Sequence, residues 1–595
     1  MHTDVQSLHR TTELVAVVRG DRPADLVIRN GRWVNVCSGE ILSGTDIAAL
    51  GERIAYCGPD ANPLIGPHTR VIEAEDRYLV PGLLDAHVHI ESAMVTPTEF
   101  ARAVLPRGTT AVFADPHEIA NVLGLRGVKL FMEEARRLPL KVYLQVPSCV
   151  PAVQGLDTPG AEIGPQEVAE SLAWPGVVGL GEVMDYPGVI AGAEGVHAKI
   201  AAALRAGKTV GGHYASPDLG RPFHSYAASG PADCHEGTRA EDAIARVRQG
   251  MRAILRQGSA WRDLAEGLRA ITDHGLDPRH VLLSTDDRHA ETVLREGHMD
   301  DVVRTAIAAG VSPMTAIQMA TLNTAEHFGV DREVGTIAPG RIADVLIVSD
   351  LAEFVVDVVV ASGTVVAAGG VLQGEFPVFR YPDWAWGTVR LGRPLRPDDL
   401  ALEAPADKGE VEVRAIELVE HQAPTREARV RLPVRGGRIE LVPGVAAVVV
   451  VERHRASGRI GKGVLIGLGL EPGCAVASTV AHDSHHLLLV GTDPAAMARA
   501  GNHVAEAGGG IAVVQGEEVR ASLPLPIAGI LSDCGVEEVA AGLAEIHAAL
   551  RACGVHLADA LMTLSLLALP VIPALRVTDK GLVDVERGAI VSPFV

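Results

Sequence analysis

The chain has 595 residues, and at roughly 100–200 residues per domain this length predicts two or three domains and excludes a minimal binding module. Its 53 Lys and Arg residues against 74 Asp and Glu residues give a formal net charge of −21, which opposes binding to phosphate backbones and anionic lipid, so we expect neither a nucleic-acid nor a membrane-surface role. A hydrophobic content of 47% indicates a folded globular protein.

Residues 1–20 carry acidic and polar side chains where a secretory signal would need an apolar stretch. The most apolar run of the chain, Leu561–Leu575, is short and contains Pro570 and Pro573, so we expect no membrane span. The seven cysteines form no CxxC pair, which favours reduced thiols over a disulfide framework or a cysteine zinc site. A cytoplasmic location is therefore expected.

Short strands separated by turn residues are predicted over residues 24–80, in ADLVIRNGRWVNV, ILSGTDIAALGERIAYCG and TRVIEAEDRYLV. The same pattern returns later in the chain, in GTIAPGRIADVLIVSD and VVDVVVASGTVVAAGG. We therefore expect the chain to leave and re-enter one small flanking β-sandwich domain, made of residues 1–80 and 335–390.

Eight apolar runs with strand character lie in between, separated by segments with helical spacing such as GLRGVKLFMEEARRL and AEDAIARVRQ. The runs are YLVPGLLDAHVHI, TTAVFADP, LKVYLQVP, VVGLGEV, TVGGHY, ASGPADCH, MRAILRQG and VLLSTDD. Strands that alternate with helices in this way predict an α/β fold, a parallel (β/α)8 TIM-type barrel over residues 81–334. The sixth run, ASGPADCH, is the least strand-like of the eight.

A third region, residues 391–595, mixes strands and helices. Strands are predicted in RIELVPGVAAVVVVERH, at the start of LLLVGTDPAAMARAGNHV and in GGGIAVVQ, and a helix near Val536–Ala552. We expect an additional C-terminal α+β domain here.

Chemically compatible groups end several of the barrel runs. His87 and His89 stand at the period of two that turns both side chains to one side of a strand, where both imidazoles can bind one metal. This HxH pair alone also fits two polar residues at a fraying strand end. Further runs end in Glu182, His213, His235 and Asp286. Because barrel active sites lie at the carboxyl ends of the strands, the set as a whole predicts a metal centre.

The chain resembles the amidohydrolase superfamily in PGLLDAHVHI, STDD and GTIAPGRIADVLIV. It resembles the bacterial adenine deaminases in longer motifs, which extend over nearly the whole chain: HIESAMVTPTEFARAVLPRGTT, ADPHEIANVLG, GLGEVMDYPGVI, STDDRHAETVLREGHMDDVVR, VAHDSHHLLLVGTDPAAM, GGGIAVVQ and LPLPIAGILSD. Two small departures from the family pattern are Asp185-Tyr186, where Asn-Phe is more usual, and His213-Tyr214, where His-Ala is more usual.

This resemblance implies an adenine aminohydrolase, which converts adenine and water to hypoxanthine and ammonia with two divalent metal ions. Manganese or iron is usual in the family, and zinc also suits such ligands. The implied metal ligands are His87, His89, Glu182, His213, His235 and Asp286. The barrel lysines, at positions 129, 141, 199 and 208, lie away from the carboxyl strand ends, which supports Glu182 rather than a carboxylated lysine as the bridging ligand.

Deamination needs a nucleophile for C6 of the purine and a proton for the leaving ammonia. A metal-bound water becomes hydroxide near neutral pH, and a nearby Asp can take its proton and pass it on. A metal-activated hydroxide, with Asp286 as proton shuttle, is expected to meet both needs.

For several residues the sequence allows either a role in the active site or a structural role. His117 and Glu118 are catalytic candidates that hydrogen-bond the purine or the metals, or they simply begin a helix. Asp115 orients them or caps that helix. Arg256 and Ser259, at the end of the seventh run, either contact the edge of the purine ring or have a structural role.

Asp483 and His485 are candidates for substrate binding from outside the barrel. The segment His482–His486 either closes over the barrel mouth, which makes the third region part of the catalytic unit, or forms a polar turn before the strand that follows.

Two other functions compete with adenine deamination. Opening of a cyclic amide, as in dihydroorotases and hydantoinases, also uses metal-activated water, but the bridging lysine is missing here. A non-catalytic, structural barrel protein is the second alternative, although such relatives usually lose ligands that are all present in this chain. The expected partners are adenine as a small-molecule substrate and a second copy of the chain, because the family is usually oligomeric and a dimer is favoured.

Overall fold

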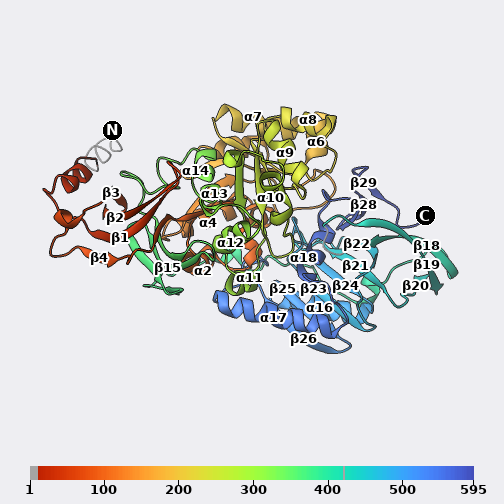
Figure 1. Cartoon of the computed structure of the whole chain (residues 1–595). Coiled ribbons are helices and arrows are strands. Elements are labelled where there is room, and N and C mark those ends of the chain that lie inside the picture. Colours follow the sequence, from red (N-terminus) through yellow and green to blue (C-terminus); the bar gives the residue numbers. More distant parts are fainter. Residues whose placement is uncertain (1–10, 420–422) are drawn as a thin grey trace.

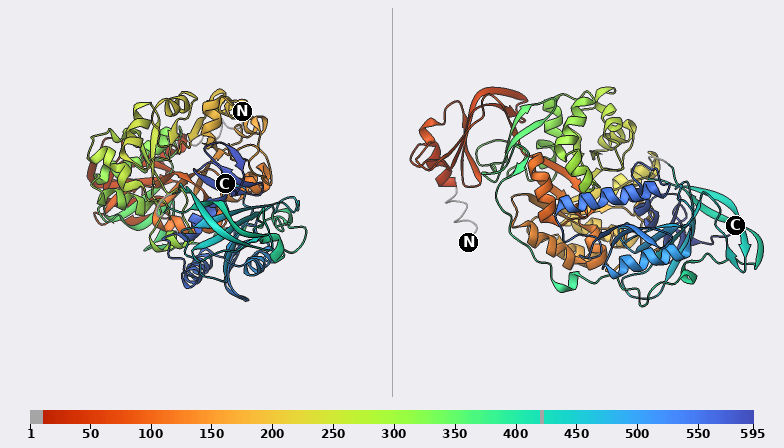
Figure 2. Two further views of the ribbon diagram at one scale, coloured as in Figure 1. Left: turned by 90° about the vertical axis from the view of Figure 1, so that its right-hand side faces the viewer. Right: turned by 90° about the horizontal axis from the view of Figure 1, so that it is seen from below.

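The computed structural model describes residues 11–419 and 423–595. A β layer near the N-terminus lies at one end of the molecule, a helix-rich body lies in the middle, and the C-terminal region lies at the other end (Figure 1). The right-hand view in Figure 2 shows the same arrangement, with the red N-terminal strands at one end and the C-terminus towards the other, while a long blue helix lies along the central body.

The β layer combines strands from two distant parts of the chain. Its strands pair in the order β17, β16, β15, β14, β5, β1, β2, β3, with β4 beside β1. Their bounds are β1 Leu26–Asn35, β2 Glu40–Leu50, β3 Arg53–Gly58, β4 Arg70–Glu73, β5 Tyr78–Pro81, β14 Val345–Asp350, β15 Val355–Ala361, β16 Thr364–Ala368 and β17 Val371–Leu372. The antiparallel pairing of β5 with β14 joins the two parts into one sheet.

The central body is built on parallel strands, one from each of the eight predicted runs. Their bounds are β6 Leu83–Val88, β7 Thr109–Ala114, β8 Lys141–Val146, β9 Val177–Val183, β10 Thr209–Gly212, β11 Asp233–Cys234, β12 Arg252–Arg256 and β13 Val281–Ser284. They form one sheet from β6 to β10 and another from β11 to β13. The backbone N–H of Ala232 bonds to Val210 O at 2.8 Å beside β10, and that of Asp286 bonds to His87 O at 3.0 Å, so the parallel sheet is curled.

Helices follow the parallel strands and cover them on the outside. Their bounds are α2 Pro97–Val104, α3 His117–Leu123, α4 Leu125–Ala135, α5 Pro165–Ser171, α6 Tyr186–Ala191, α7 Glu194–Arg205, α8 Arg221–Ala228, α9 Ala240–Arg248, α10 Leu264–Thr272, α11 Ala290–Arg295, α12 Met299–Ala308, α13 Pro313–Met319 and α14 Leu322–His327. Strand β7, TTAVFA, is buried on both faces, as expected of a parallel strand covered by helices outside and side chains inside.

The C-terminal region contains a second large antiparallel sheet. Its strands run in the order β20, β19, β18, β22, β21, β24, β23, β25, β26. Their bounds are β18 Lys408–Glu417, β19 Arg426–Arg435, β20 Arg438–Ile439, β21 Val445–Val451, β22 Ile460–Ile466, β23 Cys474–Ser478, β24 Leu487–Gly491, β25 Gly510–Gln515 and β26 Glu518–Pro524. The remaining elements are α15 Pro397–Leu400, α16 Pro494–Glu506, α17 Val536–Ala552, α18 Ala560–Ser565 and the hairpin strands β27 Leu575–Thr578, β28 Gly581–Asp584 and β29 Ala589–Val591.

Helix α17 joins the C-terminal region to the central body. Its first backbone N–H, at Val536, donates a hydrogen bond of 3.2 Å to Glu99 Oε2 of α2. The negative charge of Glu99 at this position also complements the helix dipole. Because α17 also packs against α11, the two parts of the molecule share a continuous interface.

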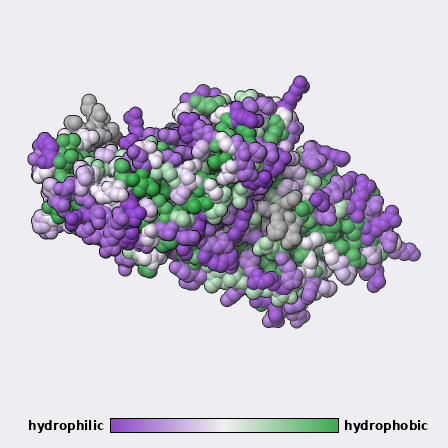
Figure 3. All heavy atoms as spheres, viewed as in Figure 1, coloured by the Kyte–Doolittle hydropathy of each residue, from purple (hydrophilic) through white to green (hydrophobic). Residues whose placement is uncertain are grey.

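Within the described residues, no helix has both the length and the apolar character that crossing a bilayer requires. On the face shown in Figure 3, hydrophilic residues are spread among the hydrophobic ones over all parts of the molecule.

Candidate active site

All the predicted metal ligands meet at the carboxyl ends of the parallel strands. His87 and Glu182 lie within β6 and β9, and the other ligands follow directly after β6, β10, β11 and β13. Each residue in this set is at most 5% exposed: His87, His89, Glu182, His213, His235 and Asp286.

Glu182 is the centre of this set. Its Oε1 lies 3.4 Å from His89 Nε2, while its Oε2 lies 3.1 Å from His235 Nε2 and contacts His213 Nδ1. Burial raises the pKa of Glu182, but His213 and His235 outweigh burial and hold that pKa well below its usual range. The two carboxylate oxygens therefore face different imidazoles, which is the geometry needed for one carboxylate to serve two cations.

Asp286 is held from two sides. Its Oδ1 lies 3.4 Å from His89 Nε2 and 3.8 Å from His87 Nε2, and its Oδ2 accepts a hydrogen bond of 2.8 Å from Arg256 Nη1. Burial raises the pKa of Asp286, but His89 and Arg256 outweigh burial and hold that pKa well below its usual range. Asp286 is therefore an anion with one oxygen directed at the imidazoles.

Asp85 fixes the ends of β6 and β13 relative to each other. Its Oδ1 accepts hydrogen bonds from the backbone N–H groups of His87 at 3.2 Å and of Thr285 at 3.1 Å, and its Oδ2 accepts one from the Thr285 hydroxyl at 2.5 Å. Asp286 follows with a φ of 57°, a left-handed conformation that is uncommon outside glycine. Asp85 thus positions both His87 and Asp286.

The residues present fit divalent cations. Possible ligand atoms lie within 4.8 Å of one another in overlapping groups: His87, Glu182 and His235; His87, His89 and Asp286; His89, His117 and Glu182. Two imidazole nitrogens of the predicted metal ligands are buried without a hydrogen-bond partner, Nε2 of His87 and Nε2 of His213. Mixed imidazole and carboxylate donors suit manganese, iron and zinc.

Asp115 supports Glu182 and does not cap a helix. Its Oδ2 accepts a hydrogen bond of 2.9 Å from the backbone N–H of Glu182, and helix α3 begins without a side-chain cap. The preceding Gly181 makes this contact possible, because a Cβ on Gly181 would lie 2.1 Å from Asp115 Oδ2. A side chain at position 181 would therefore push Asp115 away from Glu182.

We expect Gly181→Ala to lower the free energy of unfolding by about 1–3 kcal/mol, as overpacking of a buried site does, and to weaken metal retention. Urea unfolding and metal analysis would measure both effects. Gly195→Ala is the matched control, because a Cβ at this helical position meets no atom within 4 Å. Equal losses in both variants would contradict the proposed support of Glu182 by Asp115.

His117 and Glu118 open helix α3 and point to different surroundings. His117 lines the cavity at the strand ends, with Nδ1 3.3 Å from Glu182 Oε1. Glu118 does not line this cavity. Its Oε1 is 3.1 Å from His482 Nδ1, and its Oε2 is 3.6 Å from His485 Nε2. The prediction of a catalytic role therefore fits the position of His117 better than that of Glu118.

Arg256 and Ser259, at the end of β12 and just after it, differ in whether they line the cavity. Arg256 lines the cavity and bonds to Asp286 and, at 2.5 Å, to Glu236 Oε1. Ser259 does not line it, because its hydroxyl accepts a hydrogen bond from His289 N at 2.9 Å and donates one to Thr292 Oγ1 at 2.8 Å. The predicted contact of Ser259 with substrate has no counterpart in this placement.

The segment His482–His486 of the C-terminal region lies at the barrel mouth. His482 and Asp483 line the cavity, whereas His485 lies behind them and is fully buried. Arg453 holds the segment in place through a hydrogen bond to His485 O and a second one, of 3.1 Å, to Ala528 O. Asp483 is therefore placed for the predicted substrate contact, whereas His485 does not line the cavity.

Sequence reasoning missed two acidic residues, Glu236 and Asp287, and several apolar residues of the cavity. Glu236 follows the predicted ligand His235, and that adjacency is the signal that could have identified it. The apolar residues form a roof over the metal ligands: Met184, Trp261, Ala423, Leu566, Leu569 and Ile572. With a volume of about 40 Å³ the cavity is smaller than a typical small-molecule site.

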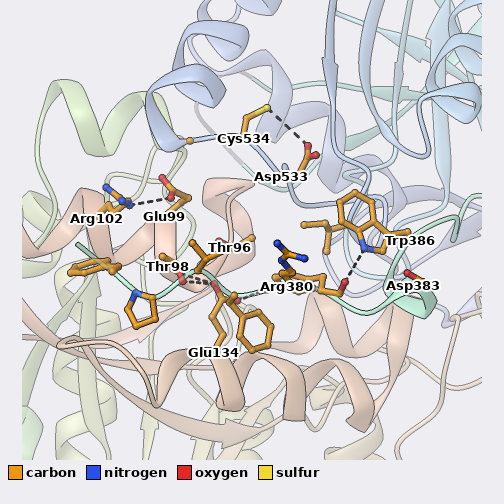
Figure 4. A pocket seen from close by; sticks show the side chains of 17 residues that line it. Thr96, Thr98, Glu99, Arg102, Glu134, Arg380, Asp383, Trp386, Asp533 and Cys534 are labelled. Atoms are coloured by element: carbon orange, nitrogen blue, oxygen red, sulfur yellow. Dashed lines mark hydrogen bonds and ion pairs between the residues drawn. The ribbon is translucent and has the colours of Figure 1, made fainter. Parts of the chain in front are cut away.

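A larger cavity, of about 510 Å³, lies away from the strand ends, between α2, the segment 376–386 and the segment 533–535 (Figure 4). Its buried acids already have partners. Glu134 accepts hydrogen bonds of 2.6 Å from the hydroxyls of Thr98 and Tyr381, and Glu99 holds the start of α17. This cavity lies at a junction between parts of the chain, away from the predicted metal ligands.

Family models match two large parts of the chain, and curated relatives match nearly its full length. Residues 78–225 and 234–366 match the amidohydrolase family, and residues 422–589 match the adenine deaminase C-terminal domain. The adenine deaminase 3 of Rhizobium meliloti (strain 1021) is 54% identical over 96% of this chain and 97% of its own length. The adenine deaminase of Mesorhizobium japonicum is 54% identical over 98% of this chain and 97% of its own length. The crystal structure of an amidohydrolase matches over 57% of this chain and 98% of its own, at 18% identity and a TM-score of 0.43.

Proposed function

Because the chain belongs to the adenine deaminase family, within the amidohydrolases, we propose that it hydrolyses adenine to hypoxanthine and ammonia. The observation that carries this proposal is a buried set of imidazoles and carboxylates beneath an apolar roof that the C-terminal region helps to build. A polar floor suits the reacting edge of a purine, and an apolar roof suits its planar faces.

The residues His87, His89, Glu182, His213, His235 and Asp286 hold two divalent cations in this proposal, manganese or iron with zinc as an alternative. Glu182 would contribute one oxygen to each, because its oxygens face different imidazoles. The cations, when bound, lower the pKa of a water molecule and so supply a nucleophile near neutral pH.

Asp286 moves the protons of the reaction. The water oxygen bonds to C6 of adenine and the C6–N bond to the amino group breaks. Asp286 Oδ1 takes one proton from the attacking water and delivers it to the leaving nitrogen, and the other proton of the water ends on the ring nitrogen N1. Arg256 occupies Asp286 Oδ2 throughout and so keeps Oδ1 directed at the reacting atoms. His117 is the second candidate for a proton carrier at this wall of the cavity.

The organisation of the chain follows from the same proposal. Residues 81–334 act as one (β/α)8 barrel that carries the ligands, residues 1–80 with 335–390 form the flanking β domain, and residues 391–595 form the C-terminal α+β domain. His482 and Asp483 make this last domain part of the catalytic unit. The dimer and the cytoplasmic location stay predictions.

The direct test incubates metal-replete protein separately with adenine, adenosine, cytosine and hydantoin, and follows ammonia release from the first three and formation of the ring-opened carbamoyl acid from hydantoin. We expect adenine to be turned over fastest by a wide margin. Ring opening of hydantoin with no ammonia from adenine would replace the proposal by the cyclic-amide alternative, and inertness towards all four compounds would favour a structural role.

A further inference from the structure

A second group of metal-ligand side chains lies beside the proposed centre. His117 and Glu118 open helix α3 of the central body, while His482 and Asp483 lie between β23 and β24 of the C-terminal region. Each of the four side chains is at most 4% exposed. Two segments more than 350 positions apart in the chain therefore bring two imidazoles and two carboxylates together in the interior.

The spacing of the donor atoms is that of a metal site. Glu118 Oε1 lies 3.1 Å from His482 Nδ1, which lies 3.8 Å from Asp483 Oδ1, which in turn lies 3.7 Å from His117 Nε2. Metal–ligand bonds of roughly 2.0–2.2 Å place neighbouring donors of a tetrahedral site about 3.3–3.6 Å apart. The same range, 3.1–3.8 Å, separates the donor atoms around Glu182 and Asp286 in the proposed centre.

Several of these buried polar atoms lack a partner. Neither carboxylate oxygen of Asp483 accepts a hydrogen bond, and Glu118 Oε2 is also unpartnered. One further carboxylate, that of Glu91, is buried beside Glu118, and its Oε2 has no hydrogen bond either. Buried carboxylate oxygens without hydrogen bonds are costly, and a cation would offset that cost together with the neighbouring imidazoles of His117 and His482.

The orientation of His117 favours a metal over a hydrogen bond. Its Nδ1 lies 3.3 Å from Glu182 Oε1 without a hydrogen bond, and its Nε2 lies 3.7 Å from Asp483 Oδ1. With the proton on Nδ1, the lone pair of Nε2 points at the side where Asp483 lies. His117 thus separates the two groups of donors and belongs by its Nε2 to the second one.

His485 is excluded as a ligand by its own hydrogen bond. Its Nδ1 accepts from the backbone N–H of Ala481 at 3.2 Å, so its Nε2 carries the ring proton. This Nε2 faces Glu118 Oε2 at 3.6 Å and leaves Glu118 Oε1 for another partner. His485 therefore orients Glu118 without offering a lone pair of its own.

We propose that His117, Glu118, His482 and Asp483 bind a third divalent cation, which links helix α3 to the C-terminal region. Two imidazoles and two carboxylates suit zinc, manganese or ferrous iron. The site differs from the proposed binuclear centre in its ligands and does not depend on which heterocycle the protein turns over. It would fasten His482 and Asp483 over the barrel mouth.

Metal analysis of the full-length protein, loaded with manganese and desalted, tests the proposal. We expect three ions per chain in the wild type and two in Glu118→Gln and in Asp483→Asn. The matched controls are Glu91→Gln, a buried carboxylate outside the donor set, and His485→Gln, which removes the non-ligating imidazole. Both controls should retain three ions, and thermal unfolding shows whether each variant is folded.

Two ions in the wild type, or three in both ligand variants, would overturn the proposal. Should the ligand variants fail to fold, anomalous scattering from crystals of the manganese-loaded wild type decides the question. A peak between His482 and Asp483, apart from those at Glu182, supports the third site, and its absence rules the site out. The ammonia assay with adenine reports on the proposed reaction separately from these counts.

Discussion

Asp286→Asn is expected to lower the turnover of adenine by roughly 10²–10⁴-fold while the fold stays intact, because general acid–base catalysis contributes about that much. An asparagine amide cannot take the proton of the attacking water. It can adopt the same backbone conformation, since Asn tolerates the left-handed region in which Asp286 lies, at a φ of 57°. Steady-state kcat, measured together with metal content, gives the result.

The control for this variant is Asp287→Asn. Asp287 is the neighbouring carboxylate and also lines the cavity, but its Oδ1 is occupied by the Ser92 hydroxyl. We expect a much smaller loss of kcat there. If Asp286→Asn loses less than about tenfold with its metals still bound, another group carries the proton, and His117 is the residue to examine next.

Glu182→Gln is expected to release the cations of the proposed binuclear centre and to abolish most of the turnover. A glutamine offers one oxygen, whereas the carboxylate presents one oxygen to His89 and the other to His235. Loss of mere supporting groups around a metal already costs about 10–100-fold in affinity or activity, and removal of a bridging ligand should exceed that. Metal content per chain and kcat are the two measurements.

Glu236→Gln provides the comparison for Glu182→Gln. Glu236 lies 3.7 Å from His235 Nε2, close to the same imidazoles, but its Oε1 is bound by Arg256. Its variant should therefore keep its metals. Full metal content and unchanged activity in Glu182→Gln would remove Glu182 from the site. Under the third-site proposal, Glu182→Gln should still hold one ion.

The elements that the sequence predicts well are those whose pattern is set by burial. All eight predicted runs contain a strand of the curled sheet, and the weakest of them, ASGPADCH, forms only the two-residue strand Asp233–Cys234. Helix α17 spans Val536–Ala552, where its periodic apolar residues place it. The hairpin of β18 and β19 is not apparent from apolar runs, because its charged residues alternate along both strands.

The candidate site likewise contains residues that the sequence indicates and residues that it does not. Histidines and carboxylates at strand ends are conspicuous in the sequence, since polar groups rarely close an apolar run without a reason. The roof residues Leu566 and Ile572 are not conspicuous in the sequence. An apolar run such as Leu561–Leu575 predicts burial but does not show which part of the protein it packs against. The sequence also does not show that Asp483 lines the cavity and His485 does not. That difference depends on the conformation of the turn, which Arg453 stabilises through a hydrogen bond to His485 O.

The pairing of β5 with β14 has a consequence for how the protein is made. Strand β5 ends at Pro81 and β14 begins at Val345, so 345 − 81 = 264 positions separate the two partners. At about 5–20 residues per second, a ribosome needs roughly 13–53 s to synthesise that stretch. Throughout this time the edge of β5 that later pairs with β14 has no strand to bond. The part of the chain that leaves the ribosome first is thus completed as a sheet only after the whole central body has been synthesised.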